Sequence, residues 1–164
     1  RHATLELFSR LREPLIARFY ADRLTLADKA RIFSGGPPVP VLKAMACLKE
    51  FAATADLAAA SFKAIGAFER AELSYFNWET KEYEPIPVDE QAEVASMTGD
   101  IAEGPDGRPV VHMHAVLGRR DGSAVAGHLN SGIVRPTLEI ILTEAPVHLR
   151  KRHDPETGLA LIAW

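Results

Sequence analysis

Three of the six histidines lie close together in the sequence, and histidine is a residue type that binds metal ions. His112 and His114 occur in the stretch Val-His-Met-His-Ala-Val, and His128 follows in Ala-Gly-His-Leu. Side chains alternate between the two faces of a strand, so His112 and His114 are expected to share one face. The spacing therefore predicts a metal site, provided that His128 reaches the same face.

The segment between these histidines decides whether His128 joins the other two. Residues 119–123, Arg-Arg-Asp-Gly-Ser, are typical of a hairpin whose three-residue loop ends with glycine in the left-handed region. Such a loop pairs Arg119 with Ser123, and this register sets position 114 opposite 128 and position 112 opposite 130. A two-residue loop would shift the register by one residue and turn His128 to the other face.

Three histidine ligands with an open fourth position are typical of catalytic zinc, whereas structural zinc generally has four protein ligands. Zinc is the expected cofactor, although iron, nickel and copper also bind imidazole. The alternative is that the histidines are hydrogen-bonded polar residues in a half-buried sheet. Glu139 is a candidate fourth ligand or general acid/base, and Arg135 is a candidate for holding an anionic group such as a small carboxylate. The alternative for both is an ion pair within the sheet.

The elements that must position these residues are expected to be mostly strands. Apolar residues at helical spacing predict one helix from Val41 to about Leu57. Short elements, divided by Gly, Asp and Pro, are expected to follow it at residues 58–67, 71–77, 79–86, 91–101, 110–117, 123–129 and 135–143. The expected fold class is α+β, a mainly antiparallel sheet with one long helix packed on it.

Length and composition favour an ordinary folded domain. The chain has 164 residues, of which 47% are hydrophobic and 25% charged. No apolar run approaches the ~20 residues that span a bilayer, and the start of the chain lacks a secretory pattern. The one cysteine cannot form an internal disulfide. We therefore expect a cytoplasmic protein without a membrane partner.

The charge balance limits what can be expected of a nucleic-acid partner. The net charge is −3, so the field of the whole molecule does not attract DNA as a strongly basic domain does. Any DNA contact must come from a local group of basic side chains, and the candidates are Arg119, Arg120, Arg150, Lys151 and Arg152. Neither GxGxxG nor GxxxxGK[ST] occurs, which argues against nucleotide-dependent chemistry.

Several stretches of the chain, taken in order, resemble the PPC ("plants and prokaryotes conserved") domain in its stand-alone bacterial form. They are residues 62–68 (Phe-Lys-Ala-Ile-Gly-Ala-Phe), 81–83, 93–100 (Glu-Val-Ala-Ser-Met-Thr-Gly-Asp), the two histidine motifs, 136–139 and 154–162. The resemblance covers residues 30–164 and leaves 1–29, where apolar residues recur at near-helical spacing, as a helical N-terminal extension. It implies an α+β fold built on an antiparallel sheet and assembly as a homotrimer.

The same resemblance bears on function. It implies DNA association, because the plant domain accompanies AT-hook motifs, although no Arg-Gly-Arg-Pro hook occurs here. The fold is also similar to that of acetolactate decarboxylase, whose zinc is held by a His-x-His pair and a later histidine, the pattern of His112, His114 and His128. The sequence thus favours a DNA-associated, regulatory protein with a three-histidine metal site. The alternatives are a zinc-dependent lyase or hydrolase of a small organic acid or ester, and a trimeric scaffold without catalysis.

Overall fold

Strands dominate the computed structural model, which describes residues 15–20 (backbone alone), 43–55, 57–145 and 149–163. The single helix of this described part is α2 (Ala44–Thr54). The strands are β1 (Leu15–Tyr20), β2 (Ala59–Asn77), β3 (Glu82–Val88), β4 (Ala92–Glu103), β5 (Pro109–Gly118), β6 (Ala124–Glu144), β7 (Arg150–His153) and β8 (Ala160–Ala163). No helix within the described residues is long and apolar enough to cross a membrane.

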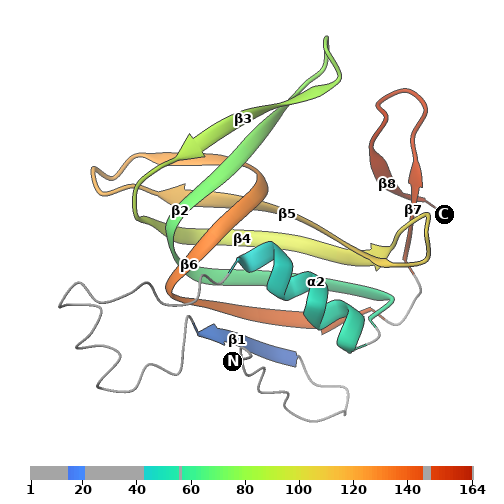
Figure 1. The fold of residues 1–164 in the computed structure, drawn as a ribbon, viewed down its shortest axis with the longest axis horizontal. Coiled ribbons are helices and arrows are strands. Elements are labelled where there is room, and N and C mark those ends of the chain that lie inside the picture. Colours follow the sequence, from blue (N-terminus) through green and yellow to red (C-terminus); the bar gives the residue numbers. More distant parts are fainter. Residues whose placement is uncertain (1–14, 21–42, 56, 146–148, 164) are drawn as a thin grey trace.

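The strands form one sheet in the order β3-β2-β6-β5-β4-β7-β8, with β1 added to β6. Because β2 also pairs with β4, the four strands β2, β6, β5 and β4 close into a ring. Two hairpins, β2–β3 and β7–β8, project from this ring on the same side (Figure 1). All strand pairs are antiparallel except the contact between β4 and β7. The mainly antiparallel α+β architecture expected from the sequence is therefore confirmed.

Two strands are longer than the sequence pattern indicates. The segments predicted at 58–67 and 71–77 form the single strand β2, and those predicted at 123–129 and 135–143 form the single strand β6. The two long strands pair with each other along most of their length, with register shifts where they bend. Pairing with the neighbouring strand thus keeps each strand extended through polar residues that, in the sequence alone, indicate the end of a strand.

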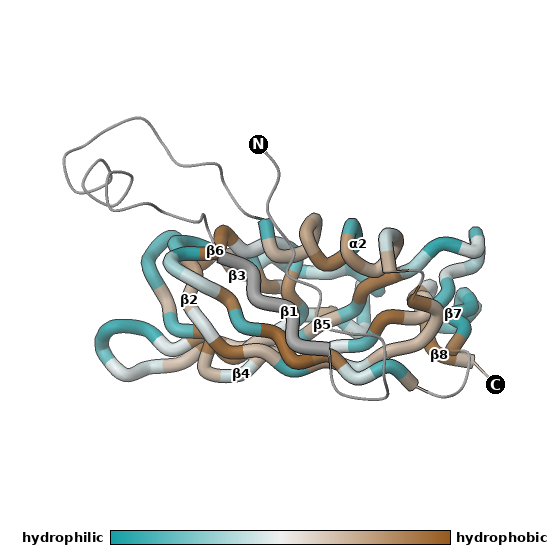
Figure 2. The backbone as a smooth tube through the Cα atoms, turned by 90° about the horizontal axis from the view of Figure 1, so that it is seen from below, coloured by the Kyte–Doolittle hydropathy of each residue, from teal (hydrophilic) through white to brown (hydrophobic). Residues whose placement is uncertain are grey.

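Helix α2 covers one face of the sheet and closes the core (Figure 2). It buries Leu48 and Phe51 against β5 and β6, among side chains such as Phe68, Met113 and Leu117. The expectation of a long helix from Val41 to about Leu57 is wrong, because α2 has only 11 residues. The backbone at position 43 is extended and bridges to β6, and the chain beyond position 55 turns into β2. A neighbouring strand therefore sets the N-terminal end of the helix.

The N-terminal extension is described only at β1. Residues 15–20 form a strand that pairs antiparallel with β6, from Leu15 opposite Leu142 to Tyr20 opposite Thr137. The helical interpretation is therefore wrong for these six residues, whose β-branched and aromatic members suit a strand that finds an open sheet edge. The rest of the predicted helical extension lies outside the described residues.

Close packing between β4 and β5 makes Gly99 a sensitive position. A Cβ atom at Gly99 would overlap the carbonyl oxygen of His112 and lie 2.5 Å from Cζ of Phe62. We expect Gly99→Ala to lower the free energy of unfolding by about 1–3 kcal/mol or more, because overpacked sites force backbone shifts. Urea denaturation followed by circular dichroism measures this loss. Gly118→Ala, whose Cβ would come no closer than 3.9 Å to Glu93, is the matched control, and equal stability of the two variants would contradict the expectation.

Candidate metal centre

The β5–β6 hairpin has the register that the turn sequence predicts. The backbone N–H of Arg119 donates to the carbonyl of Ser123 (2.8 Å), and that of Gly122 donates to the carbonyl of Arg119 (3.1 Å). Gly122 has φ of +84°, in the left-handed region that favours glycine. His114 therefore lies directly opposite His128. The three-residue loop and the pairing of positions 114 and 128 are confirmed.

His112, His114 and His128 form a compact group, called the histidine cluster below. One nitrogen atom from each ring lies within 4.8 Å of those from the other two. The ring centroids are 5.1–5.5 Å apart; the ring of His114 stands edge-on to the other two, which stack. Zn–N bonds of about 2.0–2.1 Å place nitrogens bound to one ion within about 4 Å of each other. The separations in the cluster are therefore of the size that one bound ion requires.

The electrostatics of the cluster fit a cation bound by neutral imidazoles. Nδ1 of His128 is buried and has no hydrogen-bond partner, and a buried lone pair without a partner fits a ligand to a metal ion. Burial, followed by the charges of its two partner rings, lowers the pKa of His128 to about 4. Burial also lowers the pKa of His114. Neutral imidazole is the form that coordinates metal, so little proton competition opposes binding by these two rings at neutral pH.

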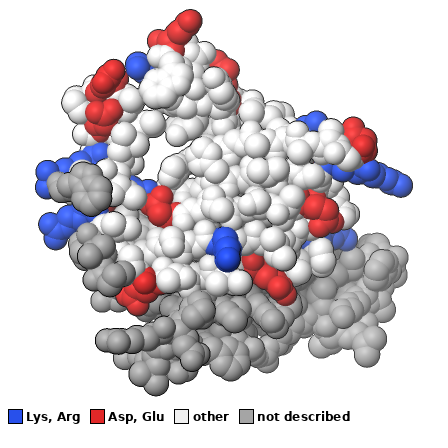
Figure 3. Space-filling view, turned by 180° about the vertical axis from the view of Figure 1, so that it is seen from behind, with Lys and Arg blue, Asp and Glu red and all other residues white. Residues whose placement is uncertain are grey.

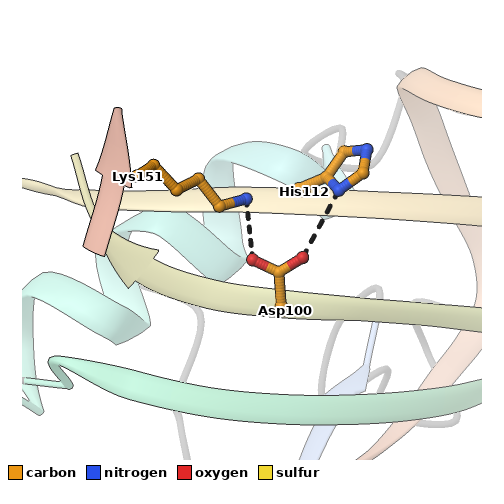
Figure 4. A network of polar contacts seen from close by, with 3 residues as sticks. All are labelled: Asp100, His112 and Lys151. Carbon is orange, nitrogen blue, oxygen red and sulfur yellow. Dashed lines mark hydrogen bonds and ion pairs between the residues drawn. The ribbon is translucent and has the colours of Figure 1, made fainter. Parts of the chain in front are cut away.

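Two residues behind the cluster were not predicted as part of it. Asp100 on β4 lies opposite His112, and its Oδ2 is 3.3 Å from Nδ1 of that ring (Figure 4). Its Oδ1 is 2.7 Å from Nζ of Lys151, a side chain only 3% exposed. Burial alone would raise the pKa of Asp100, but the hydrogen bonds and charges of His112 and Lys151 outweigh it and lower this pKa. Strand register would have pointed to Asp100, whereas nothing local points to Lys151.

An aromatic row borders the cluster on its other side. The ring of Tyr83 lies 4.9 Å from that of His128, Phe76 lies 5.2 Å from Tyr83, and Trp78 lies 5.4 Å from Phe76. Tyr83 is 40% and Trp78 65% exposed. The cluster therefore contacts the β2–β3 hairpin through Tyr83 and the β7–β8 hairpin through the Asp100–Lys151 pair. Figure 3 shows that the molecule is hollowed between these two hairpins.

The two residues proposed for catalysis lie elsewhere. Arg135 on β6 donates to Oε2 of Glu69 at 2.9 Å. Glu139 lines a shallow pocket of about 370 Å³ with Lys63 and Ile65, among others, and no histidine lines it. The structure does not bring either residue into the group of ligand atoms, which within the described residues comprises the three histidines. Arg135 therefore forms an ion pair with Glu69 within the sheet, which was the alternative interpretation for this residue.

The five basic residues considered for DNA contact do not form one surface. Arg119 and Arg120 lie at the turn between β5 and β6, whereas Arg150, Lys151 and Arg152 lie on β7 at the opposite end of the molecule (Figure 1). Lys151 is buried against Asp100. Ion pairs engage the side chain of Arg119 with Glu90 and that of Arg150 with Glu103. The accessible side chains among these five are thus divided between two ends of the molecule.

The lowered pKa of His128 predicts how the metal-free protein responds to acid. Its pKa in the folded chain is about 4 against a usual 6.5, so the unfolded chain binds the proton first. Stability is then lost as the pH falls from about 6.5 towards 4. Urea unfolding with a chelator present, at pH 7 and pH 4.5, measures this loss.

The control for this prediction is His128→Gln, which should lose less stability over the same pH range. Asp100, whose pKa is also lowered, contributes a loss of the same sign to both proteins, so their difference isolates His128. Equal losses in the two proteins would contradict the expectation.

Comparisons with known proteins divide the chain into two matched segments. The model of the Plants and Prokaryotes Conserved (PCC) domain, the PPC domain of the sequence resemblance, matches residues 43–146 and therefore includes the whole histidine cluster. The lycopene cyclase model matches residues 1–46. The chain is also 58% identical over 45 residues to lycopene beta-cyclase of Pantoea ananas, a match that covers 27% of this chain and 12% of that enzyme. The chain thus spans about an eighth of the length of the curated relatives it matches.

Solved structures agree with the longer match. A plant- and prokaryote-conserved (PPC) protein from Pyrococcus horikoshii is 25% identical with a TM-score of 0.74, covering 100% of this chain and 97% of that one. A candidate DNA-binding protein from Ralstonia eutropha is 26% identical with a TM-score of 0.70, covering 76% of this chain and 85% of that one. The ring of strands and the β5–β6 hairpin that carries the histidines lie within the segment that matches the family. The chain belongs to the Plants and Prokaryotes Conserved (PCC) domain family.

Proposed function

We propose that this protein is a metal-binding PCC-domain protein that holds one divalent transition-metal ion on His112, His114 and His128. The observation that carries the proposal is the cluster itself: three imidazoles with ligand nitrogens within 4.8 Å, one of them buried without a partner. Zinc is the ion we favour, because three histidines with an open fourth position are typical of zinc sites that act on a ligand. A bound zinc ion supplies Lewis-acid chemistry.

The residues around the cluster have separate tasks in this proposal. Asp100 accepts the Nδ1–H of His112 and so leaves Nε2 of that ring to face the ion. Tyr83 covers the ring of His128 and limits its access to water. Glu139 and Arg135 lie outside the group of ligand atoms, so a lyase or hydrolase reaction here would need other groups to move protons and hold a carboxylate. The homotrimer and the small carboxylate ligand remain proposals for this chain.

Metal content is the first test of the proposal. Elemental analysis of the purified protein should find close to one equivalent of metal per chain, and less than about a tenth of that in His114→Ala and in His128→Ala. His153→Ala is the matched control, because His153 is exposed on β7 and lies outside the cluster. Absence of metal after zinc has been supplied, or full metal content in both cluster variants, would overturn the proposal.

DNA association is the second candidate function, and it is supported by family membership and by the candidate DNA-binding protein of Ralstonia eutropha. If it holds, affinity for duplex DNA should fall steeply with salt, because phosphate contacts release counterions. Arg120→Gln should weaken binding to all sequences and reduce the slope of log affinity against log salt by about one. Fluorescence anisotropy from 25 to 200 mM salt measures both.

Arg120→Lys provides the control for the DNA experiment. It keeps the positive charge at this position, so it should leave the salt slope unchanged. No salt-dependent binding at low ionic strength would remove DNA association as a function of this protein.

A further inference from the structure

The basic residue Lys151 is almost completely buried, at 3% exposure, although it belongs to a run of three basic residues on a short strand. Lysine is almost never buried without a charged partner. Its neighbours on β7, Arg150 and Arg152, are both exposed, because alternate side chains of a strand point to opposite faces. The side chain therefore extends into the molecule rather than towards solvent, and its partner there is Asp100.

Asp100 connects this lysine to the histidine cluster. Its two carboxylate oxygens have different partners, Nζ of Lys151 on Oδ1 at 2.7 Å and Nδ1 of His112 on Oδ2 at 3.3 Å (Figure 4). A carboxylate accepts and cannot donate, so Nδ1 of the ring carries the proton and Nε2 carries the free lone pair. The three groups come from three different strands, β7, β4 and β5.

We propose that Lys151 is a positioning residue of the metal site, which fixes the carboxylate of Asp100 and through it the orientation of His112. This inference rests on the proposed metal-binding function. Without the ammonium group, the buried Oδ1 would be left with no counter-charge, and the carboxylate would be free to rotate. The ring of His112 would then lose the fixed partner that sets its tautomer and direction.

A purely structural role for the lysine makes a different prediction. The β7–β8 hairpin joins the ring through one parallel pair between β4 and β7, a backbone hydrogen bond at Glu103, and the exposed ion pair of Arg150 with Glu103. If Lys151 only anchored this hairpin, removing either ion pair would loosen it in the same way. If Lys151 positions His112, only the buried pair matters for metal affinity.

The test measures zinc affinity of the full chain by competition with a chromophoric chelator. Lys151→Met keeps the length and volume of the side chain and should weaken zinc binding about 10- to 100-fold, the range found when groups that orient a ligand are removed. Arg150→Met is the matched control and should change affinity less than twofold. The Co²⁺ absorption spectrum should change in the Lys151 variant and not in the Arg150 variant.

A double-mutant cycle separates positioning from a general effect on the fold. In a His112→Ala background, Lys151→Met should change the remaining zinc affinity less than twofold, because the ring through which it acts is gone. If Lys151→Met does not fold, the paired variant Asp100→Asn with Lys151→Met removes both charges together and preserves shape. It should show the same 10- to 100-fold loss of affinity.

The outcomes distinguish the positioning role of Lys151 from the proposed metal binding on which it rests. Zinc binding by the wild type together with unchanged affinity and spectrum in Lys151→Met, or in the paired variant, would overturn the inference and leave the metal site standing. An equal loss of affinity in Lys151→Met with and without His112 would also overturn it. Failure of the wild-type chain to bind zinc would overturn the proposed function, and the inference with it.

Discussion

The pairing of β5 with β6 is the constraint on which the candidate site depends. His112 and His114 share a face of β5 because strands alternate, but His128 joins them only because position 114 lies opposite position 128. The five-residue turn sets this register, and a slip of one residue would send His128 to the other face. The backbone hydrogen bonds of this turn, from Arg119 to Ser123 and from Gly122 to Arg119, therefore decide the ligand set from outside it.

Beside that hairpin the candidate site combines a histidine ring that stays neutral with a carboxylate that stays ionised. Burial keeps the ring of His128 neutral by lowering its pKa, whereas Asp100 remains an anion because His112 and Lys151 outweigh the effect of its burial. A cation among the three rings would add positive charge next to a buried ammonium group. The carboxylate lies between them, so it screens one from the other and orients the nearest ring. The same arrangement ties the β7–β8 hairpin to the ring of strands.

Local sequence patterns predicted the parts of the fold that local physics controls. The α+β class, the helix before the sheet and the hairpin register all follow from spacing within a few residues. The continuity of β2 through Glu69 and Arg70, and of β6 through Asn130 to Gly132, did not follow, because the partner strand and not the local sequence sustains them. The pairing of Asp100 with Lys151 was missed for the same reason, since it joins strands far apart in the chain.

The burial of Lys151 also changes how the basic residues of this chain bear on function. Counted in the sequence, residues 150–152 form a cluster of three positive charges, but the middle one is neutralised inside the molecule by Asp100. The accessible arginines of β7 and of the β5–β6 turn are separated by the length of the sheet (Figure 1). Because charges further apart than a Debye length act independently in salt, no strong local field arises from them in a single chain. Within the described residues, the proposed metal site therefore has a firmer physical basis than a nucleic-acid surface.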